Sequence, residues 1–308
     1  MTTLLYSHPT CLEHDPGRHH PESPARLRAV LAALDSPEFA QLERREAPEA
    51  AFDDLFRVHS RRHVERTLGV VPKSGHVAID ADTILSPASG AAALRAAGAV
   101  VAAVDAVVAK KADNAFCAAR PPGHHAEPER SMGFCLFNNA AIGALRAREV
   151  HGLARVAVID FDVHHGNGTQ AAFENDASLF YASSHQYPLY PGTGAASERG
   201  VGNIVNVPLR AMSGSGPFRL AMTERILPAL AAFRPELLVV SAGFDAHRDD
   251  PLAQLLLDEQ DYSWVTERLL EIAARHAEGR FVATLEGGYD LAALAASVAV
   301  HVSVLMSA

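Results

Sequence analysis

The sequence predicts an open α/β fold in which a mostly parallel sheet carries helices on both faces. Apolar, β-branched runs alternate with helical patterns over most of the chain, as expected where helices connect parallel strands. The runs are almost continuously hydrophobic, which is typical of strands buried on both faces. A chain of 308 residues with 48% hydrophobic content can bury a large core. Since no linker interrupts it, we predict a single domain, residues 1–308.

The regular elements are predicted from residue 114 onwards. Strands are expected at 114–119, 155–159, 179–183, 204–207, 237–241 and 281–285. Helices are expected at 139–150, 168–174, 218–233, 259–277 and 291–305. This alternation gives the parallel sheet its connections.

The first third of the chain is less regular, and we expect outer helices and a rim loop there. Prolines fix the entry of a helix that runs to Leu34, and Ser86-Pro87 offers a cap and a first-turn proline for a second helix. The segment 91–109 is rich in Ala and Val but contains Arg95 and Asp105. Because charges are costly in lipid, we predict a buried helix there and no membrane span.

Composition excludes several classes of function. A net charge of −9 without a basic stripe argues against nucleic acid as the main ligand, although a basic polypeptide is compatible. The cysteines, Cys11, Cys117 and Cys135, are far apart and form no CxxC, so neither a disulfide framework nor a cysteine zinc site is expected. With no signal-peptide pattern at the N-terminus, we predict a cytoplasmic protein. A homo-oligomer is compatible with the sequence, which does not specify the state.

Polar residues follow the apolar runs at the predicted strand ends. These segments are Arg120-Pro-Pro-Gly-His124-His125, Asp160-Phe-Asp162-Val-His164-His165-Gly-Asn167-Gly, Ser183-Ser184-His185, Ala242-Gly-Phe-Asp245 and Glu286-Gly-Gly-Tyr289. The carboxyl ends of parallel strands share one edge of a sheet, where open α/β folds build their sites. The pattern therefore predicts a metallohydrolase with its site at that edge.

A metal site is predicted from three of these residues. Asp162 and His164 are two positions apart, so their side chains point the same way from an extended strand end. Asp245, from another strand end, completes an Asp/His/Asp set that leaves a coordination position for water and substrate. Such a set suits zinc, iron(II) or manganese, and ligand type alone does not choose among them.

Several motifs together resemble the histone deacetylase family of zinc amidohydrolases, most closely its class II branch and its bacterial relatives. They are Arg120-Pro-Pro-Gly-His-His-Ala, Gly133-Phe-Cys-Leu-Phe-Asn-Asn, Asp160-Phe-Asp-Val-His-His-Gly-Asn-Gly-Thr, Ser241-Ala-Gly-Phe-Asp-Ala-His and Glu286-Gly-Gly-Tyr. The resemblance runs from about residue 8 to 305. It implies the arginase/deacetylase fold and the hydrolysis of acetylated lysine in proteins or peptides, or of small acetylated amines.

The resemblance also implies residue roles. The zinc ligands would be Asp162, His164 and Asp245. His125, partnered by Asn167 where class I enzymes have aspartate, would transfer protons, beside His124 oriented by Asp160. Tyr289 would donate to the developing oxyanion. A structural potassium ion would be held by backbone carbonyls of Asp160, Asp162 and His164 together with Ser183 and Ser184.

The resemblance further implies a narrow tube for the acetyl-lysine side chain. Gly133, Phe134 and Tyr190 would form its walls. Leu252 stands where polyamine-specific members carry a glutamate, which favours acetyl-lysine over acetylpolyamine. Arg26 matches an arginine beneath the zinc site, at an internal cavity through which acetate would leave, although a helix-surface arginine is an equal alternative.

Other interpretations stay open. An acetylpolyamine amidohydrolase is the main alternative, and a non-catalytic acetyl-lysine-binding protein is a further one. A binuclear manganese ureohydrolase is disfavoured because no second-metal carboxylate follows Asp162 in His165-Gly-Asn. His59 and His63 have a spacing that could bind metal, but the charged residues around them predict a solvated helix face instead.

Overall fold

The computed structural model describes residues 2–308 and contains a central sheet of eight parallel strands. Their order across the sheet is β2-β1-β5-β10-β9-β6-β7-β8. The bounds are β1 Thr3–Ser7, β2 Glu43–Glu46, β5 Asn114–Cys117, β6 Val156–Asp160, β7 Leu179–Gln186, β8 Ile204–Leu209, β9 Leu237–Ala242 and β10 Phe281–Leu285. A separate antiparallel pair is formed by β3 Val77–Ala78 and β4 Ile84–Leu85. The predicted open, mostly parallel α/β fold is confirmed.

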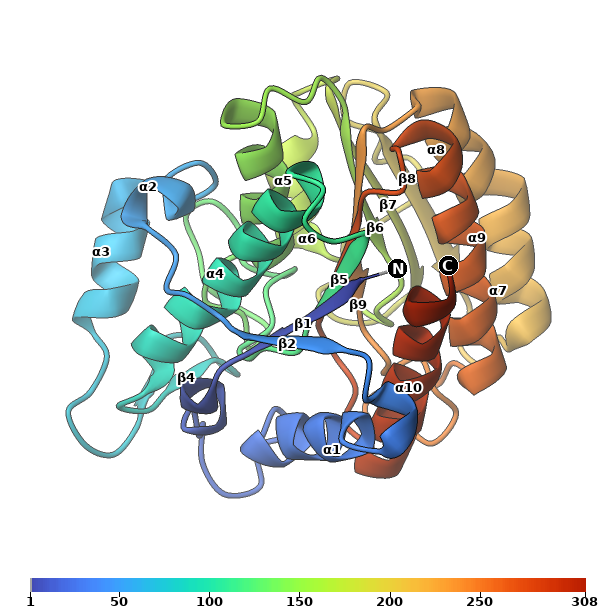
Figure 1. Ribbon diagram of the computed structural model, residues 1–308. Helices are drawn as coiled ribbons and strands as arrows, with labels where there is room; N and C mark the ends of the chain where they lie inside the picture. Colours follow the sequence, from blue (N-terminus) through green and yellow to red (C-terminus); the bar gives the residue numbers. More distant parts are fainter. Residues whose placement is uncertain (1) are drawn as a thin grey trace.

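Helices cover both faces of this sheet (Figure 1). α4 packs against α5 on one face, and α9 packs against α10 on the other. The helices are α1 Pro24–Leu34, α2 Phe52–Leu55, α3 Arg61–Gly69, α4 Ser89–Val108, α5 Asn139–Glu149, α6 Asn167–Phe173, α7 Ser215–Ala221, α8 Leu227–Phe233, α9 Glu259–His276 and α10 Leu291–Ser307. Short 3-10 helices lie at Pro9–Leu12 and Pro37–Phe39.

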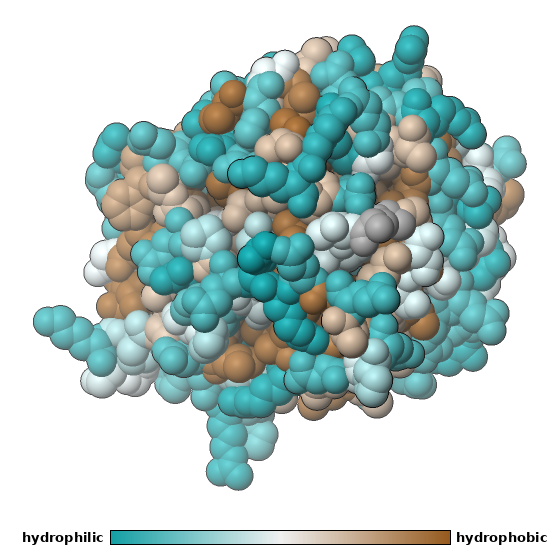
Figure 2. All heavy atoms as spheres, viewed as in Figure 1, coloured by the Kyte–Doolittle hydropathy of each residue, from teal (hydrophilic) through white to brown (hydrophobic). Residues whose placement is uncertain are grey.

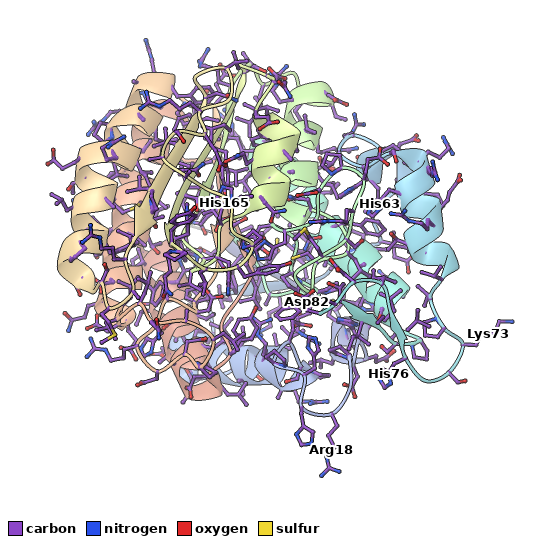
Figure 3. The ribbon with its side chains drawn as sticks, turned by 180° about the vertical axis from the view of Figure 1, so that it is seen from behind. Arg18, His63, Lys73, His76, Asp82 and His165 are labelled. Atoms are coloured by element: carbon purple, nitrogen blue, oxygen red, sulfur yellow. The ribbon has the colours of Figure 1, made fainter. Side chains whose placement is uncertain are left out.

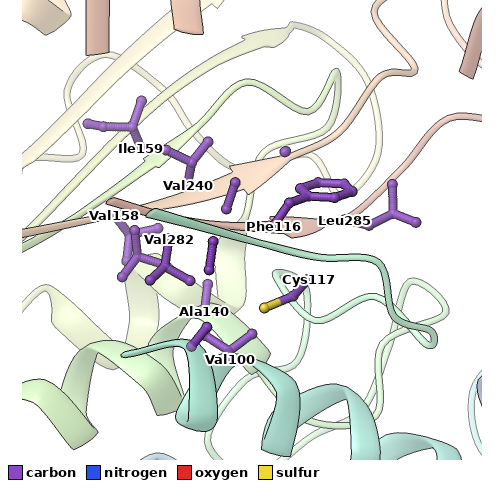
Figure 4. Close-up of a cluster of buried hydrophobic side chains, with 14 of the residues drawn as sticks. Val100, Phe116, Cys117, Ala140, Val158, Ile159, Val240, Val282 and Leu285 are labelled. Carbon is purple, nitrogen blue, oxygen red and sulfur yellow. The ribbon is translucent and has the colours of Figure 1, made fainter. Parts of the chain in front are cut away.

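The core lies between the sheet and its two helix layers. Val158 and Ile159 are neighbours on β6 and point to opposite faces of the sheet, as successive residues in a strand do (Figure 4). Val158 and Val282 point toward the helix that carries Val100, whereas Ile159 and Val240 point away from it. All of these side chains are buried. Burial on both faces explains why the central strands are continuously hydrophobic.

The first third of the chain contributes two strands of the central sheet, and the separate pair β3 and β4, that the sequence did not predict. β1 pairs with both β2 and β5, so a region expected to hold only outer helices and a rim loop also extends the sheet. β2 reads Glu-Arg-Arg-Glu and lies at the edge of the sheet, mostly exposed. Charged residues on an edge strand prevent unwanted pairing, and they also remove the hydrophobic pattern that reveals a strand.

Two predicted helices differ clearly from the structure. α4 begins at Ser89, because the Ser86 N–H donates to the Ser89 hydroxyl in a turn that precedes the helix. The helix expected at 218–233 is divided by a π-helical turn, Met222–Ile226. Pro228 follows this turn and has no N–H to donate, so a regular α-helix cannot continue through it.

α4 is long and apolar enough to span a membrane by length and composition. Within the structure, however, 67% of its apolar window is buried, and the helix packs against α5, β5 and β10. These contacts support the prediction of a core helix.

The sheet brings the predicted functional segments to one edge. β6 and β9 are adjacent, with Asp160 in register with Ser241, and β10 lies next to β9. The loops that leave the carboxyl ends of these strands therefore begin side by side. The Asp162, Asp245 and Tyr289 loops are positioned in this way.

Candidate active site

The loops after β6 and β9 bring three potential metal ligands to one point. His164 Nδ1 lies 3.1 Å from Asp162 Oδ1 and 3.1 Å from Asp245 Oδ2. One ligand atom from each residue lies within 4.8 Å of the others, and all three residues are buried. The structure thus brings the predicted Asp/His/Asp set together.

Backbone contacts fix the orientation of both carboxylates. The Gly287 N–H donates to Asp162 Oδ2 at 2.8 Å, and the Val163 N–H donates to Asp245 Oδ1 at 2.8 Å. A Cβ atom at Gly287 would lie 2.0 Å from Asp245 Oδ2, and one at Gly243 would lie 2.0 Å from Asp162 Oδ2. The glycines beside the motif aspartates are therefore required by this close approach.

The electrostatics of this set favour a cation. Burial and the nearby Asp162 raise the pKa of Asp245 to about 7, since two carboxylates in one apolar site resist double ionisation. Burial lowers the pKa of His164, but its contacts with Asp162 and Asp245 outweigh that effect and raise the pKa to about 10. A divalent cation held by the same three side chains would replace the proton of His164 and supply the positive charge between the two carboxylates.

The loop after β5 carries two adjacent histidines with different partners. His124 Nδ1 lies 2.9 Å from Asp160 Oδ2, whereas His125 Nδ1 lies 2.8 Å from the side-chain oxygen of Asn167. Burial lowers the pKa of His124, but Asp160 raises it well above its ordinary value. Burial and the charge of His124 hold the pKa of His125 well below its ordinary value. His125 is therefore neutral at neutral pH and able to accept a proton.

Tyr289 follows β10 and is held from two sides. Its backbone N–H donates to Asp250 Oδ2 at 2.7 Å, and the Arg26 guanidinium lies 4.9 Å from the centre of its ring. Arg26 also donates to the carbonyls of Glu286 and Gly288, which fixes the loop itself. Burial raises the pKa of Tyr289 well above its ordinary value, so the hydroxyl keeps its proton as a hydrogen-bond donor.

Arg26 is fully buried, which excludes the surface position considered from the sequence. It pairs with Glu22, and Glu22 also pairs with the buried Arg120. Arg26 lies behind the Tyr289 ring and does not line the pocket described next. Its contact with substrate or product stays a prediction.

A pocket of about 270 Å³ reaches His164, one of the three potential metal ligands. It is lined by Asp82, Pro122, His124, His125, Gly133, Phe134, His164, Leu189, Tyr190, Leu252, Gly287 and Tyr289. The three expected wall residues, Gly133, Phe134 and Tyr190, are among them, and so is Leu252. Tyr190 and Leu252 are 38% and 37% exposed and lie at the mouth, whereas His125 and His164 are buried. Gly133 has a φ of +57°, and a Cβ there would lie 2.4 Å from the His125 ring.

The proposed potassium ligands lie on neighbouring strands, since Ser183 of β7 is in register with Asp160 of β6. The Ser183 hydroxyl lies 2.9 Å from His185 Nδ1. The Ser184 hydroxyl is buried and has no hydrogen-bond partner among the described residues. An unpartnered buried oxygen is a suitable ligand for a cation, so the potassium site stays a prediction that this atom supports.

The prediction for His59 and His63 was wrong, because both side chains are buried. His59 precedes α3 instead of belonging to it, and its ring contacts the Glu127 carbonyl and the Asn138 N–H. Figure 3 shows His63 within the body of the molecule, whereas Lys73 projects outward. Arg61 and Arg62 are exposed, so the helix does have a solvated face, but His63 does not lie on it.

Three polar residues near the site were missed. Asp82 lines the pocket and accepts from the Gly133 N–H at 3.1 Å, Asp250 holds Tyr289, and Glu127 contacts Asn167. Asp82 lies between β3 and β4, far in sequence from any strand of the central sheet. Glu127 and Asp250 closely follow two of the motifs in sequence. Their position next to those motifs could have marked them as candidate site residues.

Comparisons with known proteins agree with this geometry. The family model for the histone deacetylase domain matches residues 20–305. The chain is 42% identical over 277 residues to a histone deacetylase-like amidohydrolase of Pseudomonas aeruginosa, covering 88% of this chain and 73% of that protein. It is 38% identical to a probable deacetylase of Archaeoglobus fulgidus, covering 94% and 82%.

A solved structure shares the whole architecture. The crystal structure of the HDA15 HD domain superposes with a TM-score of 0.92 and is 35% identical, covering 98% of this chain and 88% of that one. The match of family model, relatives and structure over nearly the entire length shows that the chain belongs to the histone deacetylase family.

Proposed function

We propose that the protein is a zinc-dependent amidohydrolase that removes acetyl groups from N-acetyl-lysine side chains or from similar acetylated amines. The observation that carries this proposal is the pocket itself, in which His164 of the Asp/His/Asp set, the neutral His125 and the protonated Tyr289 converge behind aromatic walls. These are the groups that metal-assisted amide hydrolysis uses: metal ligands, a proton acceptor and an oxyanion donor.

The donor set fits one zinc ion. Asp162, His164 and Asp245 would hold it, and three protein ligands with an open position are typical of catalytic zinc. When bound, the ion acts as a Lewis acid on the acyl carbonyl and on the attacking water.

The side chains around the set have separate tasks. His125 would accept the proton of the attacking water and pass it to the departing amine, since its ring is neutral and lines the pocket. Tyr289 would donate its hydroxyl to the oxygen on which negative charge develops. His124, held by Asp160, supplies a fixed positive charge beside His125.

The pocket shape supports a long, thin substrate. The methylene chain of an acetylated lysine would lie between Phe134 and Tyr190, with the amide at the buried end. An acetylpolyamine is the second candidate, and one observation favours it: Asp82 is a carboxylate in the lining, where a second ammonium could bind. Leu252 at the mouth offers no such charge, which is why acetyl-lysine remains our first choice.

The wider setting of the enzyme is also proposed. We take residues 1–308 as one catalytic domain, supported by a sheet that draws strands from both ends of the chain. A potassium ion at Ser183 and Ser184 would be structural. The cysteines are free and buried, which is compatible with a reducing compartment such as the cytoplasm. On the face in Figure 2, polar side chains surround small, separate apolar areas; a homo-oligomer stays a prediction.

A substrate screen with metal-defined enzyme tests the proposal. Zinc-loaded protein would be assayed on peptides with acetyl-lysine and longer acyl-lysines, and on acetylated putrescine and spermidine. We expect measurable kcat/KM values, highest for acetyl-lysine peptides. A preference for acetylated polyamines would favour the second candidate. Binding of acetyl-lysine peptide without turnover by the zinc-loaded enzyme would contradict the proposal and favour a binding protein.

A further inference from the structure

We infer that Glu127 is a positioning residue, which sets the tautomer of His125 by holding the side-chain amide of Asn167. This inference rests on the proposed function, because it concerns the histidine to which proton transfer is assigned. Glu127 lies two positions after His125, does not line the pocket, and so acts through Asn167.

The contacts of Asn167 define the orientation of its side-chain amide, that is, which side its NH₂ group faces and which side its oxygen faces. Its Nδ2 donates to Glu127 Oε1 at 2.7 Å and lies 3.4 Å from both the His125 carbonyl oxygen and the Met132 sulfur. All three of these atoms are acceptors. Only the NH₂ end of the amide can face them without repulsion, so the amide oxygen must face the other way.

That orientation determines where the proton of His125 resides. The Asn167 side-chain oxygen lies 2.8 Å from His125 Nδ1, and an amide oxygen can only accept a hydrogen bond. Nδ1 must therefore carry the hydrogen. In a neutral imidazole this leaves Nε2 with its lone pair, ready to accept a proton.

Glu127 is the strongest of the three acceptors that hold Asn167. The other two contacts are long, and one involves a weakly accepting thioether sulfur. The two ends of an asparagine amide have nearly the same shape, so packing cannot prevent the amide from turning over. Without the carboxylate, a turned amide would present its NH₂ to His125 Nδ1, and the hydrogen would move to Nε2.

Glu127 is itself held in place. Its backbone N–H donates to the Arg130 carbonyl at 2.9 Å, and its own carbonyl oxygen lies 3.0 Å from His59 Nδ1. Its outer oxygen Oε2 lies 3.7 Å from Arg130 Nε. The buried His59 thus has a structural purpose, because it anchors the backbone from which Glu127 reaches Asn167.

The test compares Glu127→Ala, Glu127→Gln and the loop control Glu129→Gln in the zinc-loaded protein. Glu129 bonds to Ser60 and has no contact with Asn167. Nitrogen-15 spectra of labelled histidine report the tautomer directly, with His125 assigned by the loss of its signals in His125→Phe. We expect the Nδ1–H form in wild type, Glu127→Gln and Glu129→Gln, because glutamine offers the same acceptor oxygen. Glu127→Ala should show the Nε2–H form.

Kinetics supply the second readout. Glu127→Ala should lower kcat about 10- to 100-fold with little change in KM, the range for partners that orient a functional histidine. Glu127→Gln should keep kcat within about threefold of wild type. A small loss is expected because the neutral glutamine oxygen bonds to Asn167 less strongly than a carboxylate does. In an Asn167→Ala background, Glu127→Ala should have no further effect.

Two results would overturn the inference: a wild-type tautomer in Glu127→Ala, or losses that add independently in the double variant. Failure of the proposed function has a different signature, because wild-type protein would then lack turnover on every amide while the histidine spectra still report the effect of Glu127.

Discussion

Replacing Tyr289 with phenylalanine removes one oxygen atom from the pocket and little else. The ring contacts with Phe134, at 5.9 Å between centroids, and with the Arg26 guanidinium, at 4.9 Å, do not involve the hydroxyl. The backbone bond to Asp250 is also independent of it. We therefore expect unchanged folding stability and unchanged zinc content.

The expected loss of turnover follows from the state of that hydroxyl. Because burial raises the pKa of Tyr289 well above its ordinary value, the group is a neutral donor at every pH at which the enzyme would work. Removing one preorganised oxyanion donor typically costs about 10²- to 10³-fold in kcat, or roughly 3–4 kcal/mol of transition-state stabilisation. Substrate affinity should change little, since the oxyanion exists only in the transition state.

The assay measures kcat and KM on an acetyl-lysine peptide, with zinc content and thermal unfolding recorded alongside. Tyr6→Phe is the matched control, because Tyr6 lies on β1, away from the site, and its hydroxyl contacts the Ala102 carbonyl of α4 at 3.4 Å. Turnover of Tyr289→Phe within a few-fold of wild type would show that the hydroxyl does not contact the reacting oxygen.

Three further predictions concern metal, specificity and pH. Chelation should abolish activity, and zinc should restore it with one ion bound per chain, as measured by metal analysis. Two tightly held ions, or full activity without metal, would refute the single site at Asp162, His164 and Asp245. Leu252→Glu should raise the kcat/KM ratio of acetylated polyamine to acetyl-lysine peptide, modestly because exposed ion pairs contribute about 0–1 kcal/mol; an unchanged ratio would mean that the residue does not face substrate. Burial lowers the pKa of His301 to about 3, below its value of about 6.5 in the unfolded chain. Between these two pH values the unfolded state binds more protons than the folded state. The free energy of unfolding therefore decreases as the pH falls from 6.5 toward 3. Between about pH 7 and 5, the free energy of unfolding of His301→Leu should therefore decrease by roughly 2 kcal/mol less than that of wild type, as measured by urea unfolding. Equal decreases would show that His301 is not held neutral in the folded state.

The sequence predicted those features that a local pattern encodes. Buried central strands such as β6 are recognisable because burial on both faces demands continuous apolar residues. The metal ligands are recognisable because they follow those strands directly. β2 escaped prediction because an edge strand needs no apolar face, and the buried His63 escaped because the loop that covers it comes from residues far along the chain.

The opposite roles of His124 and His125 illustrate the same limit. The two residues are neighbours on one loop, and nothing in their immediate sequence distinguishes them. Their difference arises from long-range partners: a carboxylate, Asp160, keeps His124 charged, whereas an amide, Asn167, lets burial and the charge of His124 keep His125 neutral.

An amide offers one further property that a carboxylate lacks. A carboxylate presents the same acceptor from either oxygen, so it needs nothing behind it to fix the tautomer of its histidine. An amide has a donor end and an acceptor end, and something must specify which end faces the ring. At Asn167 the only charged acceptor on the far side, among the described residues, is Glu127. The choice of asparagine as the partner of His125 therefore entails a hydrogen-bond acceptor at or near the position that Glu127 occupies, and a carboxylate serves there because it accepts from either oxygen.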